Sequence, residues 1–177
     1  MRFLLLALAL VFAAPALAQE RDMTEARPSP NASVSQTVGT STMTVDYGRP
    51  SVRGREIFGG LVPYDAVWRT GANEATVLTT DADIMVGDTK LAAGSYALFT
   101  VPGKEGWTVI FNSVAEQWGA YNYDAAQDVA RVEVIAETTL PVQEQLRITF
   151  EDVTEDSALL TIRWDTVGVP VRVMLAG

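Results

Sequence analysis

The stretch Ser95–Asn112, SYALFTVPGKEGWTVIFN, contains two apolar runs joined by turn residues. Ser95–Val101 and Trp107–Asn112 are rich in aromatic and β-branched residues, which favour strands. The link between them begins with Pro102-Gly103, a pair typical of tight turns because proline presets its φ angle and glycine accepts a positive one. The stretch therefore predicts a β-hairpin.

The same pattern continues on both sides of this hairpin. Ala32–Val38 and Thr42–Tyr47 alternate between apolar and polar residues and are joined by a link containing glycine, so they predict a second hairpin. Further strands are predicted at Ala75–Thr80, Asp83–Val86, Val129–Glu137, Gln145–Val153, Ala158–Trp164 and Val169–Leu175. About ten short strands separated by turn residues indicate an all-β fold. We expect a single-domain antiparallel β-sandwich, jelly-roll-like, with a long irregular crossover loop and little helix.

The beginning of the chain is typical of a signal peptide. Residues 1–18 read MRFLLLALALVFAAPALA, with one arginine, an apolar run and small residues at Ala16 and Ala18. We therefore expect an exported protein, periplasmic or secreted, cleaved after Ala18. The alternative is a membrane anchor, but the apolar run is shorter than the roughly 20 residues that cross a bilayer. We expect no integral membrane segment after cleavage.

The remainder divides into a leader and one domain. Residues 19–31, QERDMTEARPSPN, are polar, charged and contain proline, so they predict a flexible leader. Residues 32–177 have the size of a single domain that can bury a core of its own.

The composition limits the chemistry open to this chain. It contains no cysteine and no histidine. Disulfides are therefore excluded. The chain also lacks the usual ligands of zinc, copper and haem. It cannot form a Ser-His or Cys-His nucleophile system. We therefore predict neither a metal nor a cofactor. The formal net charge of -9 also argues against a nucleic-acid partner.

The stretch Tyr47–Thr76, YGRPSVRGREIFGGLVPYDAVWRTGANEAT, shows neither strand alternation nor a helical stripe. It predicts the crossover loop, and loops of this kind often carry binding sites. A locally positive patch is expected from its four arginines, Arg49, Arg53, Arg55 and Arg69. Arg53 and Arg55 flank a glycine and in an extended segment point to the same side, which suits a small anion. The alternative is that these arginines neutralise acidic residues of the same domain.

Aromatic and amide side chains accompany these arginines. Tyr64 and Trp68 can stack on a sugar ring or another planar group, while Asn73 and Glu74 can hydrogen-bond its hydroxyls. The alternative is that Trp68 belongs to the core and that Asn73 caps a turn.

A second aromatic group, Trp118–Asp124, is predicted to lie in a loop with one helical turn, where it can face the first group across a cleft. The alternative is that this loop seals one end of the sandwich. The predicted ligand-binding residues are Arg49, Arg53, Arg55, Tyr64, Trp68, Arg69, Asn73, Glu74, Trp118 and Tyr121.

Three functions remain open on these grounds. We expect a non-catalytic binding module for a small anionic or carbohydrate-like ligand or an envelope partner, because no nucleophile–base pair accompanies the cluster. The second is a glycan-acting hydrolase or lyase, with Glu74 as the acid–base residue and Tyr64 or Tyr121 assisting. The third is a purely structural envelope domain whose crossover closes one end of the sandwich.

Several motifs together resemble one bacterial family. RPSVRGREIFGGLVPY at residues 49–64 and WRTGANEAT at residues 68–76 are the most specific, and GSYALFTVPGKEGWTVIFN, QWGAYNYD and DVARVEV follow them. They resemble the family called domain of unknown function 2911, from about Ser29 to Trp164. The resemblance implies an exported, mostly β domain, and it implies no activity, substrate or catalytic residue.

Overall fold

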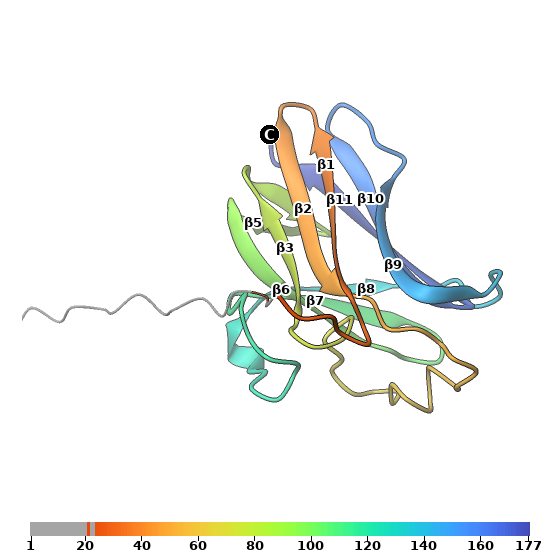
Figure 1. Ribbon diagram of the computed structural model, residues 1–177. Helices are drawn as coiled ribbons and strands as arrows, with labels where there is room; N and C mark the ends of the chain where they lie inside the picture. Colours follow the sequence, from red (N-terminus) through yellow and green to blue (C-terminus); the bar gives the residue numbers. More distant parts are fainter. Residues whose placement is uncertain (1–20, 22–23) are drawn as a thin grey trace, which may run out of the picture.

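The computed structural model describes Arg21 and residues 24–177, and these residues form two antiparallel sheets (Figure 1). The larger sheet has the strand order β1-β2-β3-β6-β7-β8, and the smaller has the order β5-β4-β11-β10-β9. The prediction of an all-β sandwich is confirmed. The predicted signal peptide, residues 1–18, lies outside the described residues.

The strands of the larger sheet are β1 (Asn31–Val38), β2 (Ser41–Gly48), β3 (Thr76–Thr80), β6 (Gly94–Val101), β7 (Trp107–Asn112) and β8 (Asp128–Val134). Those of the smaller sheet are β4 (Ile84–Val86), β5 (Thr89–Leu91), β9 (Gln143–Glu151), β10 (Ser157–Asp165) and β11 (Val167–Leu175). Within the described residues the helical element is one 3-10 turn, η1 (Ala125–Gln127), which Asp124 caps. No helix in this part of the chain is long and apolar enough to cross a membrane.

Both predicted hairpins are present. β6 and β7 pair antiparallel with Val101 opposite Thr108, and β1 and β2 pair with Val38 opposite Ser41. The sequence did not predict β5, because its three residues, Thr89–Leu91, include a single apolar side chain, whereas β4 is apolar throughout.

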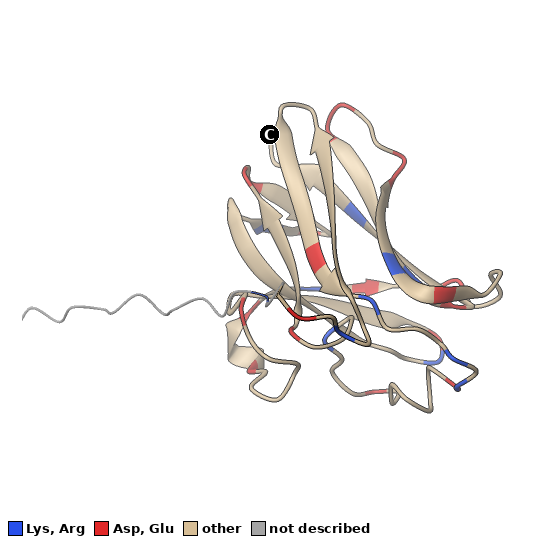
Figure 2. Cartoon of the chain, viewed as in Figure 1, with Lys and Arg blue, Asp and Glu red and all other residues tan. Residues whose placement is uncertain are grey.

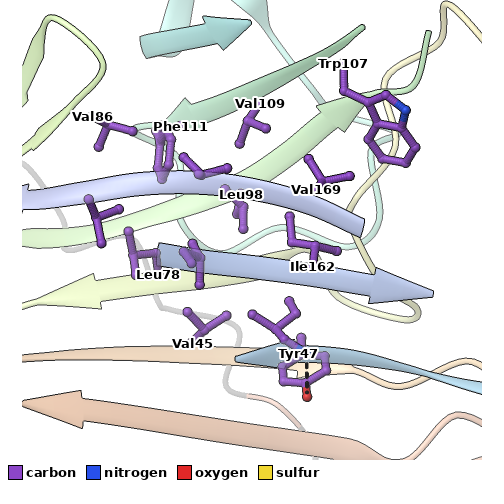
Figure 3. Close-up of a cluster of buried hydrophobic side chains, with 14 of the residues drawn as sticks. Val45, Tyr47, Leu78, Val86, Leu98, Trp107, Val109, Phe111, Ile162 and Val169 are labelled. Atoms are coloured by element: carbon purple, nitrogen blue, oxygen red, sulfur yellow. Dashed lines mark hydrogen bonds between the residues drawn. The ribbon is translucent and has the colours of Figure 1, made fainter. Parts of the chain in front are cut away.

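The core lies between the sheets, because each strand turns every second side chain inward. Leu78, Leu98 and Phe111 of the larger sheet meet Ile162 and Val169 of the smaller one in a single buried cluster (Figure 3). Burying an apolar side chain of this size contributes about 1.5–3 kcal/mol, so this layer supplies the main driving force for folding.

The connection from β2 to β3, residues 49–75, is the predicted crossover, and its first residues cover the outer edge of β9. The Leu146 amide donates to the Pro50 carbonyl at 2.9 Å. The Ile148 amide donates to the Tyr47 hydroxyl at 3.1 Å, which also links the two sheets. Because an unpaired strand edge attracts other chains, this cover protects β9 from edge-to-edge association.

The middle of the crossover seals one end of the sandwich with aromatic rings. The Trp68 ring stacks on the Trp164 ring with centroids 5.7 Å apart. The Phe58 ring meets both rings edge-on, and its centroid lies 4.9 Å from the centroid of the Trp107 ring. Trp68 is only 8% exposed, and its indole nitrogen donates to the Gly71 carbonyl at 3.1 Å. Trp68 is therefore part of the core, as one of the two sequence interpretations has it.

The crossover returns to the larger sheet through a close backbone contact at the end of β2. A Cβ atom on Gly48 would lie 2.2 Å from the carbonyl oxygen of Ala72. Beside this contact, Thr70 and Asn73 have φ angles of 53° and 65°, which are uncommon for residues other than glycine. The Thr76 hydroxyl donates to the Thr70 carbonyl at 2.9 Å, so packing and hydrogen bonding hold the strained turn in place.

We expect Gly48→Ala to lower the free energy of unfolding by about 3 kcal/mol, because the added methyl group would overlap the backbone of Ala72. Denaturant unfolding measures this loss. Gly106→Ala is the matched control, since a Cβ there meets nothing nearer than 3.6 Å. The control should stay within about 1 kcal/mol of wild type. Equal stability of the two variants would contradict the close contact.

Candidate functional site

The described part of the N-terminal segment, Arg21 and residues 24–30, lies against the domain; we call it the docked leader (Figure 1). The sequence predicts a flexible leader, whereas these residues make specific contacts. Backbone carbonyls of the docked leader accept hydrogen bonds from the crossover: from Arg49 N to Pro30 O at 2.9 Å, from Asn73 Nδ2 to Ser29 O at 3.0 Å, and from Arg53 Nη2 to Pro28 O at 3.2 Å.

The carboxylate of Glu74 is the centre of this contact. Glu74 is 7% exposed, and Arg27 Nη1 donates to its Oε1 and Oε2 at 2.8 and 2.7 Å. Arg21 Nη1 lies 3.8 Å from Glu74 Oε2. Arg21 Nη2 donates to the backbone carbonyls of Asp46, at 2.8 Å, and Ala75. Sequence reasoning selected Glu74 but missed both arginines, because the polar composition around them indicates disorder.

The surroundings of Glu74 decide its charge. Burial alone would raise the pKa of Glu74. Hydrogen bonds from Arg27 and from the backbone amide of Glu74 act in the opposite direction, as do the charges of Arg27 and Arg21. Together they outweigh burial, so the pKa of Glu74 is lowered. Burial lowers the pKa of Arg21, and the charges of Glu74 and Asp46 partly offset this. Glu74 therefore stays ionised at neutral pH, which suits an electrostatic anchor better than a general acid.

A cavity of about 420 Å³ adjoins this contact on the outer face of the larger sheet. Its floor consists of outward-facing residues of β2, β3 and β6: Asp46, Val77, Thr79 and Ser95. These strands are neighbours in the sheet, so residues distant in sequence share one floor. Arg21 of the docked leader stands on one side, and the loop after β7 contributes Ala115, Glu116 and Gln117.

Gln117, which lies on this loop and lines the cavity, is only 8% exposed. Its Nε2 donates to the Val114 carbonyl at 2.8 Å, which leaves Oε1 as the free end of the amide. Oε1 is buried and accepts no hydrogen bond within the described residues. Because a buried acceptor without a donor is costly, this atom is suited to a ligand that brings a donor.

The loop that carries Gln117 is anchored at its far end. The Tyr123 hydroxyl donates to Asp128 Oδ2 at 2.6 Å, and Asn112 Nδ2 donates to Asp128 Oδ1 at 2.8 Å. The Tyr123 ring also meets Phe99 edge-on, 5.2 Å between centroids. These contacts hold residues 113–127 on the outer face of the larger sheet and so keep this wall of the cavity in place.

The crossover lies at the end of the sandwich away from the C-terminus (Figure 2), and backbone carbonyls accept hydrogen bonds from three of its arginines, Arg49, Arg53 and Arg55. Arg49 Nε donates to the Leu146 carbonyl at 2.9 Å. Arg55 donates to the carbonyls of Val52 and Ser51. Arg53 has a φ of 49°, so the segment turns there and lacks the extended form on which a paired anion site depends.

The predicted aromatic residues lie in different places. Trp68 is in the core, and the Tyr64 ring lies against Gly59. Trp118 and Tyr121 are 45% and 82% exposed on the loop after β7. Of the ten predicted ligand-binding residues, Glu74 alone lines the cavity.

Arg69 is the remaining member of the predicted set. It is half-buried near the exposed loop, where burial lowers its pKa and the neighbouring Tyr121 partly offsets this. Backbone pairing between Glu74 and Trp118 joins this loop to the end of the crossover. The crossover and the loop after β7 are thus linked through the backbone.

The fold and the cavity define a class of protein: a β-sandwich domain with a cavity of small-molecule size on the outer face of its larger sheet. The chain belongs to the family described as Protein of unknown function (DUF2911), whose model matches residues 29–173. The resemblance seen in the sequence is confirmed. Neither the curated proteins nor the solved structures contain a match to this chain. The matched residues include Glu74 and the cavity floor, whereas Arg21 and Arg27 precede them.

We expect Glu74→Gln to lower the free energy of unfolding by about 2 kcal/mol at neutral pH, because it replaces the carboxylate that accepts both hydrogen bonds from Arg27 Nη1 with a neutral amide. Denaturant unfolding measures the loss. The matched control is Asp83→Asn, which breaks the exposed pair between Lys90 and Asp83 and should change stability little.

The same variant should show a characteristic pH dependence. Since the pKa of folded Glu74 lies below the ordinary value of 4.5, its contribution is fully present above that pH. It is lost as the pH falls through the folded pKa. The difference in unfolding free energy between wild type and Glu74→Gln should therefore be constant near neutral pH and decline below pH 4.5. A difference that grew on acidification would contradict the lowered pKa.

Proposed function

We propose that this protein is a non-catalytic binding module that holds a small carbohydrate-like ligand in the cavity beside Glu74. The cavity itself is the observation that carries this proposal. Its volume of about 420 Å³ falls within the range of about 300–1,000 Å³ found for small-molecule sites.

The lining supports a sugar-like ligand better than a small anion. Val77 offers an apolar surface for the carbon face of a ring, beside the hydroxyls of Thr79 and Ser95. The carboxylates of Asp46 and Glu116 accept hydrogen bonds and repel anions. Three of the crossover arginines that suggest an anion site in the sequence, Arg49, Arg53 and Arg55, donate to backbone carbonyls away from this lining.

Glycan hydrolysis has less support. A carboxylic acid that protonates a glycosidic oxygen needs a raised pKa, whereas the pKa of Glu74 is lowered. Arg27 also engages both carboxylate oxygens of Glu74. The purely structural alternative accounts for Trp68, which seals the sandwich, but assigns no role to the cavity.

Filling the cavity tests the proposal. Val77→Phe places a ring on the floor without touching the core, because this side chain faces outward from β3. Calorimetric titration with a panel of mono- and disaccharides should detect binding to wild type and at least about tenfold weaker binding to this variant, an energy change of about 1.4 kcal/mol.

The matched control is Val129→Phe, the same change at an exposed residue at the start of β8 that does not line the cavity. It should bind saccharides as wild type does. The proposal fails if no saccharide binds wild type, or if Val77→Phe binds with unchanged affinity.

Export is the second part of the proposal, and the composition of residues 1–18 supports it. Signal peptidase is expected to cleave after Ala18, so that the mature chain begins at Gln19. Intact-mass measurement of protein recovered from the periplasm or medium checks this. Recovery of the uncleaved chain in the cytoplasm would contradict it.

A further inference from the structure

We infer that the ligand of this cavity is a hydroxylated amine, of which an amino sugar with a free amine is the simplest example. The inference rests on the proposed function and narrows its ligand class from carbohydrate-like molecules to those that carry an ammonium group.

The charges on the lining are unbalanced. Three carboxylates, those of Asp46, Glu74 and Glu116, line the cavity together with one guanidinium, that of Arg21. Arg27 pairs with Glu74 without lining the cavity, and counting it still leaves an excess of negative charge. A cationic ligand would balance this excess, whereas an anionic one would increase the repulsion.

Most donors of the basic groups of the site are already engaged; Arg21 Nη1, buried and 3.8 Å from Glu74 Oε2, donates no hydrogen bond within the described residues, and a ligand hydroxyl oxygen can accept from it. Arg27 donates to both oxygens of Glu74, and Arg21 donates to two backbone carbonyls. Asp46 and Glu116 make no ion pair within the described residues. The carboxylates available to a ligand are therefore those of Asp46, whose charge also acts on Arg21, and Glu116, and an ammonium group is their natural complement.

Gln117 gives an independent indication of the same kind. This side chain is more than nine-tenths buried and lines the cavity, and its Oε1 accepts no hydrogen bond within the described residues. An amide oxygen can only accept, so an N–H or O–H donor on a ligand would satisfy it once a small movement of the Gln117 side chain brings Oε1 to the cavity surface. Hydroxyl and ammonium groups on adjacent carbons supply several donors within the span of one sugar ring.

The experiment compares four probes on the full mature chain: D-glucosamine, N-acetyl-D-glucosamine, D-glucose and cyclohexylamine. Titrations are made at slightly acidic pH, where both amines are protonated. Glucosamine should bind at least about tenfold more tightly than each of the other three. Raising the salt from about 50 mM to about 500 mM should reduce this advantage, because part of the attraction is electrostatic.

The variants Asp46→Asn and Glu116→Gln remove the two available carboxylates with little change in shape. Together they should abolish the preference for glucosamine over glucose. The matched control is Asp88→Asn with Glu133→Gln, two exposed carboxylates outside the cavity, and it should keep the preference. Loss of the preference in the control as well would show that net charge alone produces it and would overturn the inference.

The remaining outcomes separate the inference from the proposed function. Equal binding of glucose, N-acetylglucosamine and glucosamine overturns the inference and leaves the proposed function standing. If cyclohexylamine binds as tightly as glucosamine, the ligand does not need hydroxyl groups and the inference is overturned. If, in addition, glucose does not bind, the proposed function is overturned as well. Absence of binding by every probe and by the wider saccharide panel overturns both.

Discussion

The stacking of Trp68 on Trp164 is the contact on which the rest of the architecture depends. A chain without cysteine has to close its sandwich by packing. Here the crossover that leaves the larger sheet after β2 places the Trp68 ring against Trp164 of the smaller sheet. Because Trp68 is fixed, the residues that follow leave the core at one place and in one direction. The backbone turns at Thr70 and Asn73, and Glu74 therefore lies beside the cavity on the outer face of the larger sheet.

Glu74 then determines what the N-terminal segment does. A nearly buried carboxylate needs partners, and Arg27 and Arg21 provide them from a segment whose composition indicates disorder. Ordering a few residues costs conformational free energy, which two guanidinium groups and several backbone contacts offset. The docked leader thus adds Arg21 to the lining of the cavity and is held by charge on a domain that apolar packing stabilises.

Much of the fold could be predicted from the sequence, because alternation in β2, β9 and β10 marks their inward faces directly. Trp68 could be placed in the core only as one of two interpretations, since nothing local distinguishes a sealing ring from a binding ring. The cavity could not be predicted. Its floor joins Asp46 to Ser95, residues that meet only through the order of β2, β3 and β6. A local pattern carries no information about that order.

The alternation of β3 and β6 also separates two tasks within single strands. Leu78 and Leu98 hold the sandwich together, while Val77 and Ser95, one or a few positions away, face the cavity. Mutation of the outward set leaves the inward set in register. The lining of the cavity can therefore change, in evolution or by design, while the residues that form the core stay the same.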